Sequence, residues 1–145
     1  MTWWSVIRFL HVLGAALWVG GQLAVSLVLL PLARRMLAAE RRAELLAAVG
    51  KRFGILTVAV FLPVQLATGV AIAVHHGVSW GSLGEPGYGR ILGAKLVLFV
   101  LVMVAAAVHG WASRGGRAVL ARWLAIGALA GSVGVLLLAT ALPTT

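Results

Sequence analysis

Long apolar runs separated by short polar segments dominate the chain. A helix needs about 20 consecutive apolar residues to cross a bilayer, and four runs reach that length. We expect the spans to cover Trp3–Leu32, Phe53–His75, Tyr88–Ala112 and Ala121–Leu142. Because a spanning segment in lipid must satisfy its own backbone hydrogen bonds, the pattern predicts an all-α, integral membrane four-helix bundle. We expect a single domain over residues 1–145.

The composition agrees with a membrane protein and excludes several other classes. Of the 145 residues, 62% are hydrophobic and 10% are charged, so the lipid bilayer is the first expected partner. The chain has no cysteine, which excludes disulfides and thiolate metal sites. The net charge of +9 comes from basic residues between the apolar runs, where they set topology, and we expect no nucleic-acid partner.

The basic residues are distributed unevenly over the connecting segments. The first connection contains Arg34, Arg35, Arg41, Arg42, Lys51 and Arg52, and the third contains Arg114, Arg117 and Arg122. The second connection, His76–Gly87, has no Lys or Arg. The positive-inside rule therefore predicts an N-out/C-out protein with a basic cytoplasmic first loop, multi-pass in the inner (cytoplasmic) membrane of a bacterium. The basic segment Arg34–Arg52 is rich in helix formers and is expected to extend the first helix or to lie on the inner leaflet.

His11 and Lys95 are ionisable residues inside the apolar runs. Lys95 interrupts the run Ile91–Val108, and an intramembrane lysine indicates a functional site. His11 and Lys95 each follow an expected outer-interface aromatic, Trp4 or Tyr88, by seven residues. At 1.5 Å per residue both would lie about 10 Å below the outer interface. We therefore expect them to share one level of the bundle.

Other polar residues extend this candidate site. Gln65 is expected near mid-membrane, and Trp18 shares a helical stripe with His11. We assign cofactor binding to His11, Lys95 and Gln65, and metal binding to His11 with the outer pair His75 and His76. Trp18 and His109 are accessory candidates, the latter near the inner surface, and no catalytic residue is assigned.

Each candidate also has a purely structural interpretation. Lys95 can extend its amine to the outer interface, and His11 and Gln65 can form hydrogen bonds between helices. His75 and His76 are compatible with a hydrated helix end, and His109 with an interfacial residue.

Several short motifs resemble known membrane families. They are Leu10–Gly21, the Thr68-Gly69 pair, Gly93–Leu98 and His109–Trp111. Together they resemble CopD-like proteins, linked to copper resistance and uptake, and HemJ-like proteins, the membrane protoporphyrinogen oxidases.

The resemblance implies roles for two residues. His11 would correspond to an essential first-helix histidine, and Lys95 to the third-helix lysine of HemJ-like proteins. The chain departs from the HemJ-like pattern because Lys95 and His109 lie about one turn further apart than expected. In addition, Val108 replaces a tyrosine and Leu29–Leu32 replaces a segment rich in arginine and tyrosine. These differences favour the CopD-like group.

Three hypotheses follow, and the choice between copper and haem b stays open. In the first, a CopD-like protein handles copper at an outward-facing site centred on His11, supplied by a periplasmic metal donor. In the second, a HemJ-like redox protein binds haem b through His11, with Lys95 as second ligand, base or propionate partner, and exchanges electrons with a redox partner. In the third, the chain is a cofactor-free assembly partner. Four helices are few for transport, so a homodimer is compatible with the first hypothesis.

Overall fold

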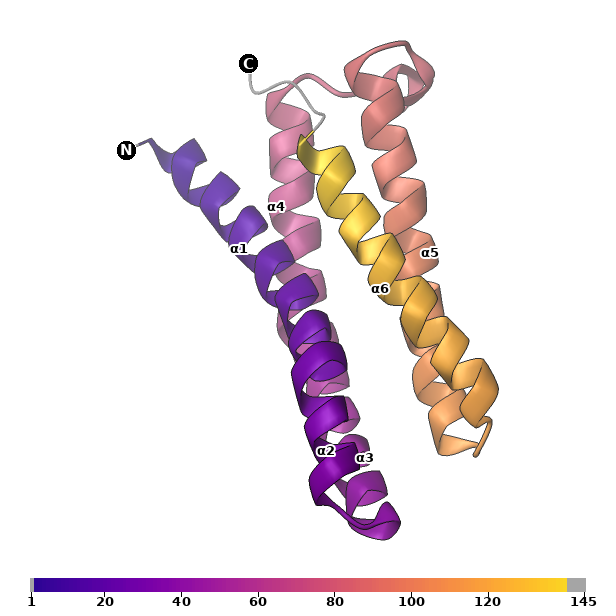
Figure 1. Cartoon of the computed structure of the whole chain (residues 1–145). Coiled ribbons are helices and arrows are strands. Elements are labelled where there is room, and N and C mark those ends of the chain that lie inside the picture. Colours follow the sequence, from indigo (N-terminus) through magenta and orange to yellow (C-terminus); the bar gives the residue numbers. More distant parts are fainter. Residues whose placement is uncertain (1, 141–145) are drawn as a thin grey trace. The chain divides into compact units, whose positions relative to one another are not determined.

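The computed structural model describes residues 2–140, and this part of the chain contains helices and turns but no strand. The chain divides into two compact units, Met1–His76 and Gly77–Thr145. Each unit is a hairpin of two long helical arms (Figure 1). The prediction of one four-helix domain depends on how these units associate, and it stays a prediction.

The first unit pairs two arms that each contain three helical segments. The first arm consists of α1 (Trp3–Ala24), the π-helical η1 (Val25–Leu29) and α2 (Leu30–Met36). The second arm consists of α3 (Ala39–Leu56), the π-helical η2 (Thr57–Phe61) and α4 (Leu62–His75). In this antiparallel arrangement α1 packs against α4 and α2 packs against α3 (Figure 1).

A proline explains the π-helical segment in each arm. The Leu30 N–H donates to the Val25 carbonyl, five residues back, directly before Pro31. Proline has no N–H and crowds the preceding turn, so an α-helix cannot continue through it unchanged. The wider π turn accommodates the ring and keeps the arm continuous. The segment η2 stands in the same position before Pro63.

The basic segment is helical, as the sequence predicted, but most of it belongs to the second arm. Only Leu37 and Ala38 interrupt the helices, and α3 runs from Ala39 into the second span. The expectation that Arg34–Arg52 extends the first helix holds only as far as Met36, and a position on the inner leaflet stays a prediction. Most of the segment extends the second helix, because its Ala, Leu, Glu and Arg residues favour helix and no proline lies between Ala39 and Pro63.

The second unit contains a short loop helix and two long helices. These are the 3-10 helix η3 (Gly81–Gly84), α5 (Tyr88–Arg114) and α6 (Ala118–Thr140). The observed ends of α5 and α6 agree with the predicted spans to within three residues, except that the predicted end at Leu142 lies outside the described residues. Gly116 makes the turn between them with φ +69°, a conformation that favours glycine.

Two glycines let α6 approach α5 closely. A Cβ on Gly131 would lie 2.5 Å from Val102 Cγ2, and one on Gly134 would lie 3.0 Å from Leu98 Cδ2. Gly127, which shares the predicted small-residue spacing, has nothing within 4 Å. The close approach therefore depends on the second and third of the three predicted glycines.

Gly131→Leu is expected to destabilise the second hairpin by about 1–3 kcal/mol, because the added side chain would displace Val102 from its buried position. Gly127→Leu on the same helix is the matched control, since it adds the same side chain in open space. Thermal unfolding in detergent would measure both variants. Equal unfolding temperatures would show that the close approach contributes nothing to stability.

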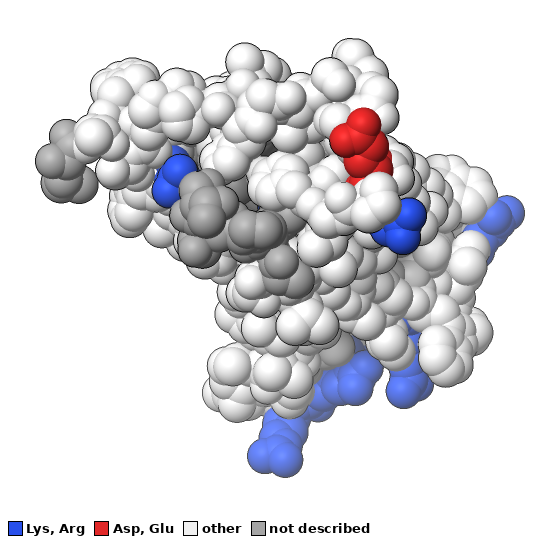
Figure 2. Space-filling model, turned by 90° about the horizontal axis from the view of Figure 1, so that it is seen from above, with Lys and Arg blue, Asp and Glu red and all other residues white. Residues whose placement is uncertain are grey.

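Apolar side chains cover the outside of the helices. Four helices are long and apolar enough to cross a membrane: Trp3–Met36, Ala39–His75, Tyr88–Arg114 and Ala118–Thr140. Large side chains such as Leu17 (67% exposed) and Leu137 (70% exposed) point outward. In the view of Figure 2, uncharged residues make up most of the visible surface. Such a surface is unfavourable in water and favourable in lipid, as expected of a multi-pass membrane protein.

Candidate functional site

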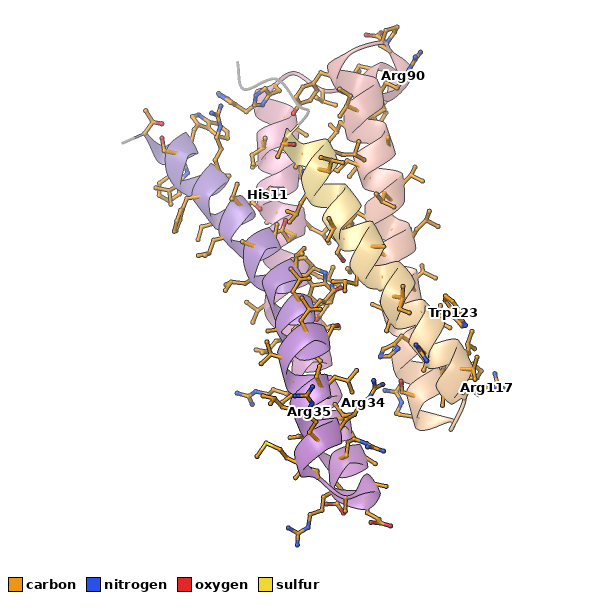
Figure 3. All side chains as sticks on the ribbon, viewed as in Figure 1. His11, Arg34, Arg35, Arg90, Arg117 and Trp123 are labelled. Carbon is orange, nitrogen blue, oxygen red and sulfur yellow. The ribbon has the colours of Figure 1, made fainter. Side chains whose placement is uncertain are left out.

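His11 lies where α1 runs beside α4 (Figure 3). Its ring Nδ1 is 2.8 Å from the hydroxyl of Thr68 on α4. One turn earlier on α4, the buried Gln65 donates from Nε2 to the backbone carbonyl of His11, at 2.7 Å. Gln65 thus contacts the backbone of His11, as expected of a hydrogen bond between helices. The partner of the ring itself is Thr68.

The hydrogen bonds of Thr68 determine the tautomer of His11. The Thr68 hydroxyl donates to the Val64 carbonyl at 2.6 Å, and a carbonyl can only accept. With its single proton directed to Val64, the hydroxyl oxygen accepts from His11, so the histidine carries its proton on Nδ1. When the ring is neutral, this arrangement leaves the lone pair on Nε2. Metal-binding histidines are commonly held in this way, with the other ring N–H donated to a fixed acceptor.

Two glycines bring the helices close enough for these contacts. A Cβ on Gly69 would lie 3.3 Å from His11 Cε1, so the edge of the ring rests on the backbone of α4. A side chain on Gly14 would collide with the Gln65 amide. The Thr68-Gly69 pair therefore has a direct physical role, because one residue accepts from the ring and the other makes room for it.

Sequence reasoning missed one residue of this site, Thr68, and a cation near it along α1, Arg8. Thr68 was noted as part of a motif but not as the partner of His11, although it lies on the same helical stripe as Gln65. Arg8 was not considered. It lies three residues before His11, which places it on the same side of α1, and its side chain is exposed.

Trp18 belongs to an aromatic cluster rather than to the polar contacts. It stacks on Phe61 with ring centroids 4.7 Å apart and lies 5.0 Å from Phe53, both on the second arm. A Cβ on Gly21 would lie 2.7 Å from Phe53 Cε2, so this glycine makes room for the cluster. Trp18 is buried, and its Nε1 has no hydrogen-bond partner among the described residues. Its position supports a packing role below His11.

His75 and His76 form a separate group at the end of α4. His75 stacks on Trp4 with ring centroids 3.9 Å apart, and His76 Nδ1 lies 2.8 Å from the Ile72 carbonyl. His75 follows Thr68 by seven residues, about 10 Å along the helix. The structure does not bring His75 and His76 together with His11. Within residues 2–140, no group of three or more His, Cys, Asp or Glu side chains could hold a metal ion.

Lys95 and His109 belong to the second unit. Lys95 lies on α5 and is partly exposed, and its pairing with His11 stays a prediction. His109 Nδ1 lies 2.7 Å from the Ala121 carbonyl and donates to it. This bond ties the end of α5 to the first turns of α6, so the structure gives His109 a structural role.

Comparison of the chain with protein-family models, with curated proteins and with solved structures found no match. The CopD-like and HemJ-like resemblance therefore stays a prediction from short motifs.

Proposed function

We propose that this chain is a membrane redox protein that binds haem b, with His11 Nε2 as an axial ligand to the iron. The observation that carries the proposal is the His11–Thr68 hydrogen bond. It holds the ring in the tautomer whose Nε2 can coordinate a metal, and it fixes the orientation of the ring. A histidine inside an apolar span that serves no function would be expensive to keep there.

The donor set around His11 suits haem better than a copper ion. The four nitrogens of a porphyrin supply most of the coordination, so one or two protein ligands are sufficient. A copper ion needs most of its ligands from the protein, and the described residues contain no group of three suitable side chains. Arg8, one turn from His11 on the same side of α1, adds a cation that can pair with a haem propionate.

The residues of the first hairpin have distinct roles in this proposal. His11 would ligate the iron, the Thr68 hydroxyl accepts a hydrogen bond from the ring Nδ1–H and orients the ring, and Gln65 holds the backbone of His11 against α4. Bound haem would supply one-electron redox chemistry, tuned by the axial ligand and its hydrogen bonds. The apolar surface of the helices would keep the site in a low-dielectric environment.

The proposal includes the topology expected from the sequence. The protein would lie in the cytoplasmic membrane with both ends outside, which places His11 toward the periplasmic side. A HemJ-like porphyrinogen oxidation is the corresponding enzymatic activity, and a periplasmic or membrane-bound redox partner would exchange the electrons.

Copper handling is the second candidate, and the outer histidines favour it. His75 and His76 are adjacent at the end of α4, with ring centroids 5.7 Å apart. Two imidazoles at a membrane surface can capture a copper ion before a further ligand completes the site. In this alternative the CopD-like resemblance gives the class of protein.

The test is an absorption spectrum of the purified protein in detergent, oxidised and then reduced with dithionite, with iron and copper measured in the same sample. A Soret band that sharpens and shifts on reduction, with stoichiometric iron, would support the proposal. Stoichiometric copper without a Soret band would support the second candidate. If the protein binds neither haem nor copper after reconstitution, both proposals are overturned and a cofactor-free assembly role is supported.

Thr68→Val is expected to weaken haem retention by roughly 10- to 100-fold, because valine keeps the shape of threonine but cannot accept the His11 proton. Thr68→Ser retains the hydroxyl and is expected to retain haem as well as the original chain does. Haem transfer to apomyoglobin, followed by absorption, measures the dissociation rate. If valine and serine variants lose haem equally slowly, the hydrogen bond does not orient the ligand.

A further inference from the structure

A groove at the turn between α5 and α6 combines apolar walls with a cation. Its volume is about 650 Å³, and it is lined by Gly116, Arg117, Ala118, Val119, Leu120 and Trp123. Trp123 is 67% exposed and Val119 is 72% exposed, so the apolar wall is open to the surroundings. Arg117 lies at the turn and Trp123 lies further along α6 (Figure 3).

The turn is strongly positive. Arg114, Arg117 and Arg122 occur within nine residues, and all three side chains are exposed. The chain has three acidic residues in all, and the only one in this unit is Glu85. Glu85 precedes α5, whose 27 residues separate it from the turn by about 40 Å. Among the described residues of this unit, no carboxylate therefore neutralises the arginines at the turn.

Arg117 is held in position over an aromatic ring. Its guanidinium carbon lies 4.4 Å from the centroid of Trp111 on α5. This cation–π contact restricts the side chain before any ligand arrives, and it leaves the planar N–H groups able to donate to an anion. The groove thus offers an oriented cation at one end and an apolar wall at the other.

We propose that the α5–α6 turn binds an anionic phospholipid, with the phosphate at Arg117 and an acyl chain along Val119, Leu120 and Trp123. Both helices are long and apolar enough to cross a membrane, so their connecting turn lies at headgroup level. Basic side chains at this level attract anionic lipids, and tryptophan favours the same interface. An amphiphile matches the groove because it supplies both the charge and the apolar chain. This inference is independent of the haem proposal.

The test is native mass spectrometry of the full chain in detergent, titrated with phosphatidylglycerol or phosphatidylcholine. We expect tighter binding of phosphatidylglycerol. Arg117→Gln should lower that affinity about five-fold, as expected for the loss of one basic contact near a membrane. Arg117→Lys should retain most of it, and Trp123→Ala should lower it by shortening the apolar wall.

Arg90→Gln is the matched control, since it removes the same charge from an exposed position in the first turn of α5. It should leave the affinity for phosphatidylglycerol unchanged. Equal binding of both lipids, or an equal loss in Arg90→Gln and Arg117→Gln, would overturn the proposal. Thermal unfolding checks that Arg117→Gln is folded, and the Trp123→Ala result tests the site independently of that variant.

Discussion

His11→Gln is expected to abolish the reduced-haem absorption spectrum while the first hairpin remains folded. Glutamine can still donate a hydrogen bond toward Thr68 but has no imidazole nitrogen to coordinate iron. His11→Ala should lose haem equally and should also be less stable, because it removes the contact with Thr68. The measurement is the dithionite-reduced minus oxidised spectrum, with thermal unfolding of the same samples.

His11→Gln and His11→Ala together distinguish a role of His11 as a haem ligand from a purely structural role between α1 and α4. If His11 serves only to hold α1 against α4, His11→Gln should behave like the original chain in every measurement. His75→Ala and His76→Ala are controls on the neighbouring helix end, and both should keep the haem spectrum. A full Soret band in His11→Gln would place the ligand elsewhere and remove the basis of the proposed function.

Gly89→Ala is expected to destabilise the second hairpin by about 2 kcal/mol or more, although alanine normally favours a helix over glycine by about 1 kcal/mol. A Cβ on Gly89 would collide with the backbone carbonyl oxygen of Ser82, in the loop packed against the start of α5. A backbone group cannot rotate aside as the end of a side chain can. Gly93 faces the Leu83 carbonyl in the same way, with a Cβ-to-oxygen distance of 2.9 Å.

Gly127→Ala is the matched control for this substitution. It adds the same methyl group within α6, where nothing lies within 4 Å, so it should raise stability by up to about 1 kcal/mol. The unfolding temperature in detergent should therefore fall for Gly89→Ala and rise for Gly127→Ala. If the unfolding temperature rises in both variants, the loop can move away from α5 at little cost in free energy.

The positions of the helical spans could be predicted from hydropathy, but the way each helix is aligned along its neighbour could not. The second and third spans end within two residues of the predicted His75 and Ala112, because a run of apolar residues is a local property of the chain. The basic segment was misassigned because composition favours helix without indicating which neighbour the helix continues. The prolines at positions 31 and 63 mark a disturbance of each helix, but only the structure shows that a π turn accommodates it rather than a kink or a break.

The candidate site shows the same division. His11 and Gln65 were recognisable from sequence, because a polar residue in an apolar span is conspicuous. Thr68 was not recognisable as part of the site. Threonine is common in membrane helices, where its hydroxyl can donate a hydrogen bond to a carbonyl of the preceding turn, as Thr68 does. The length of the apolar runs was thus enough to identify the spanning helices and the polar residues within them. The tertiary contacts of the first hairpin decided which of those residues meet, because the glycine-dependent register of α1 against α4 selects the partner of each side chain.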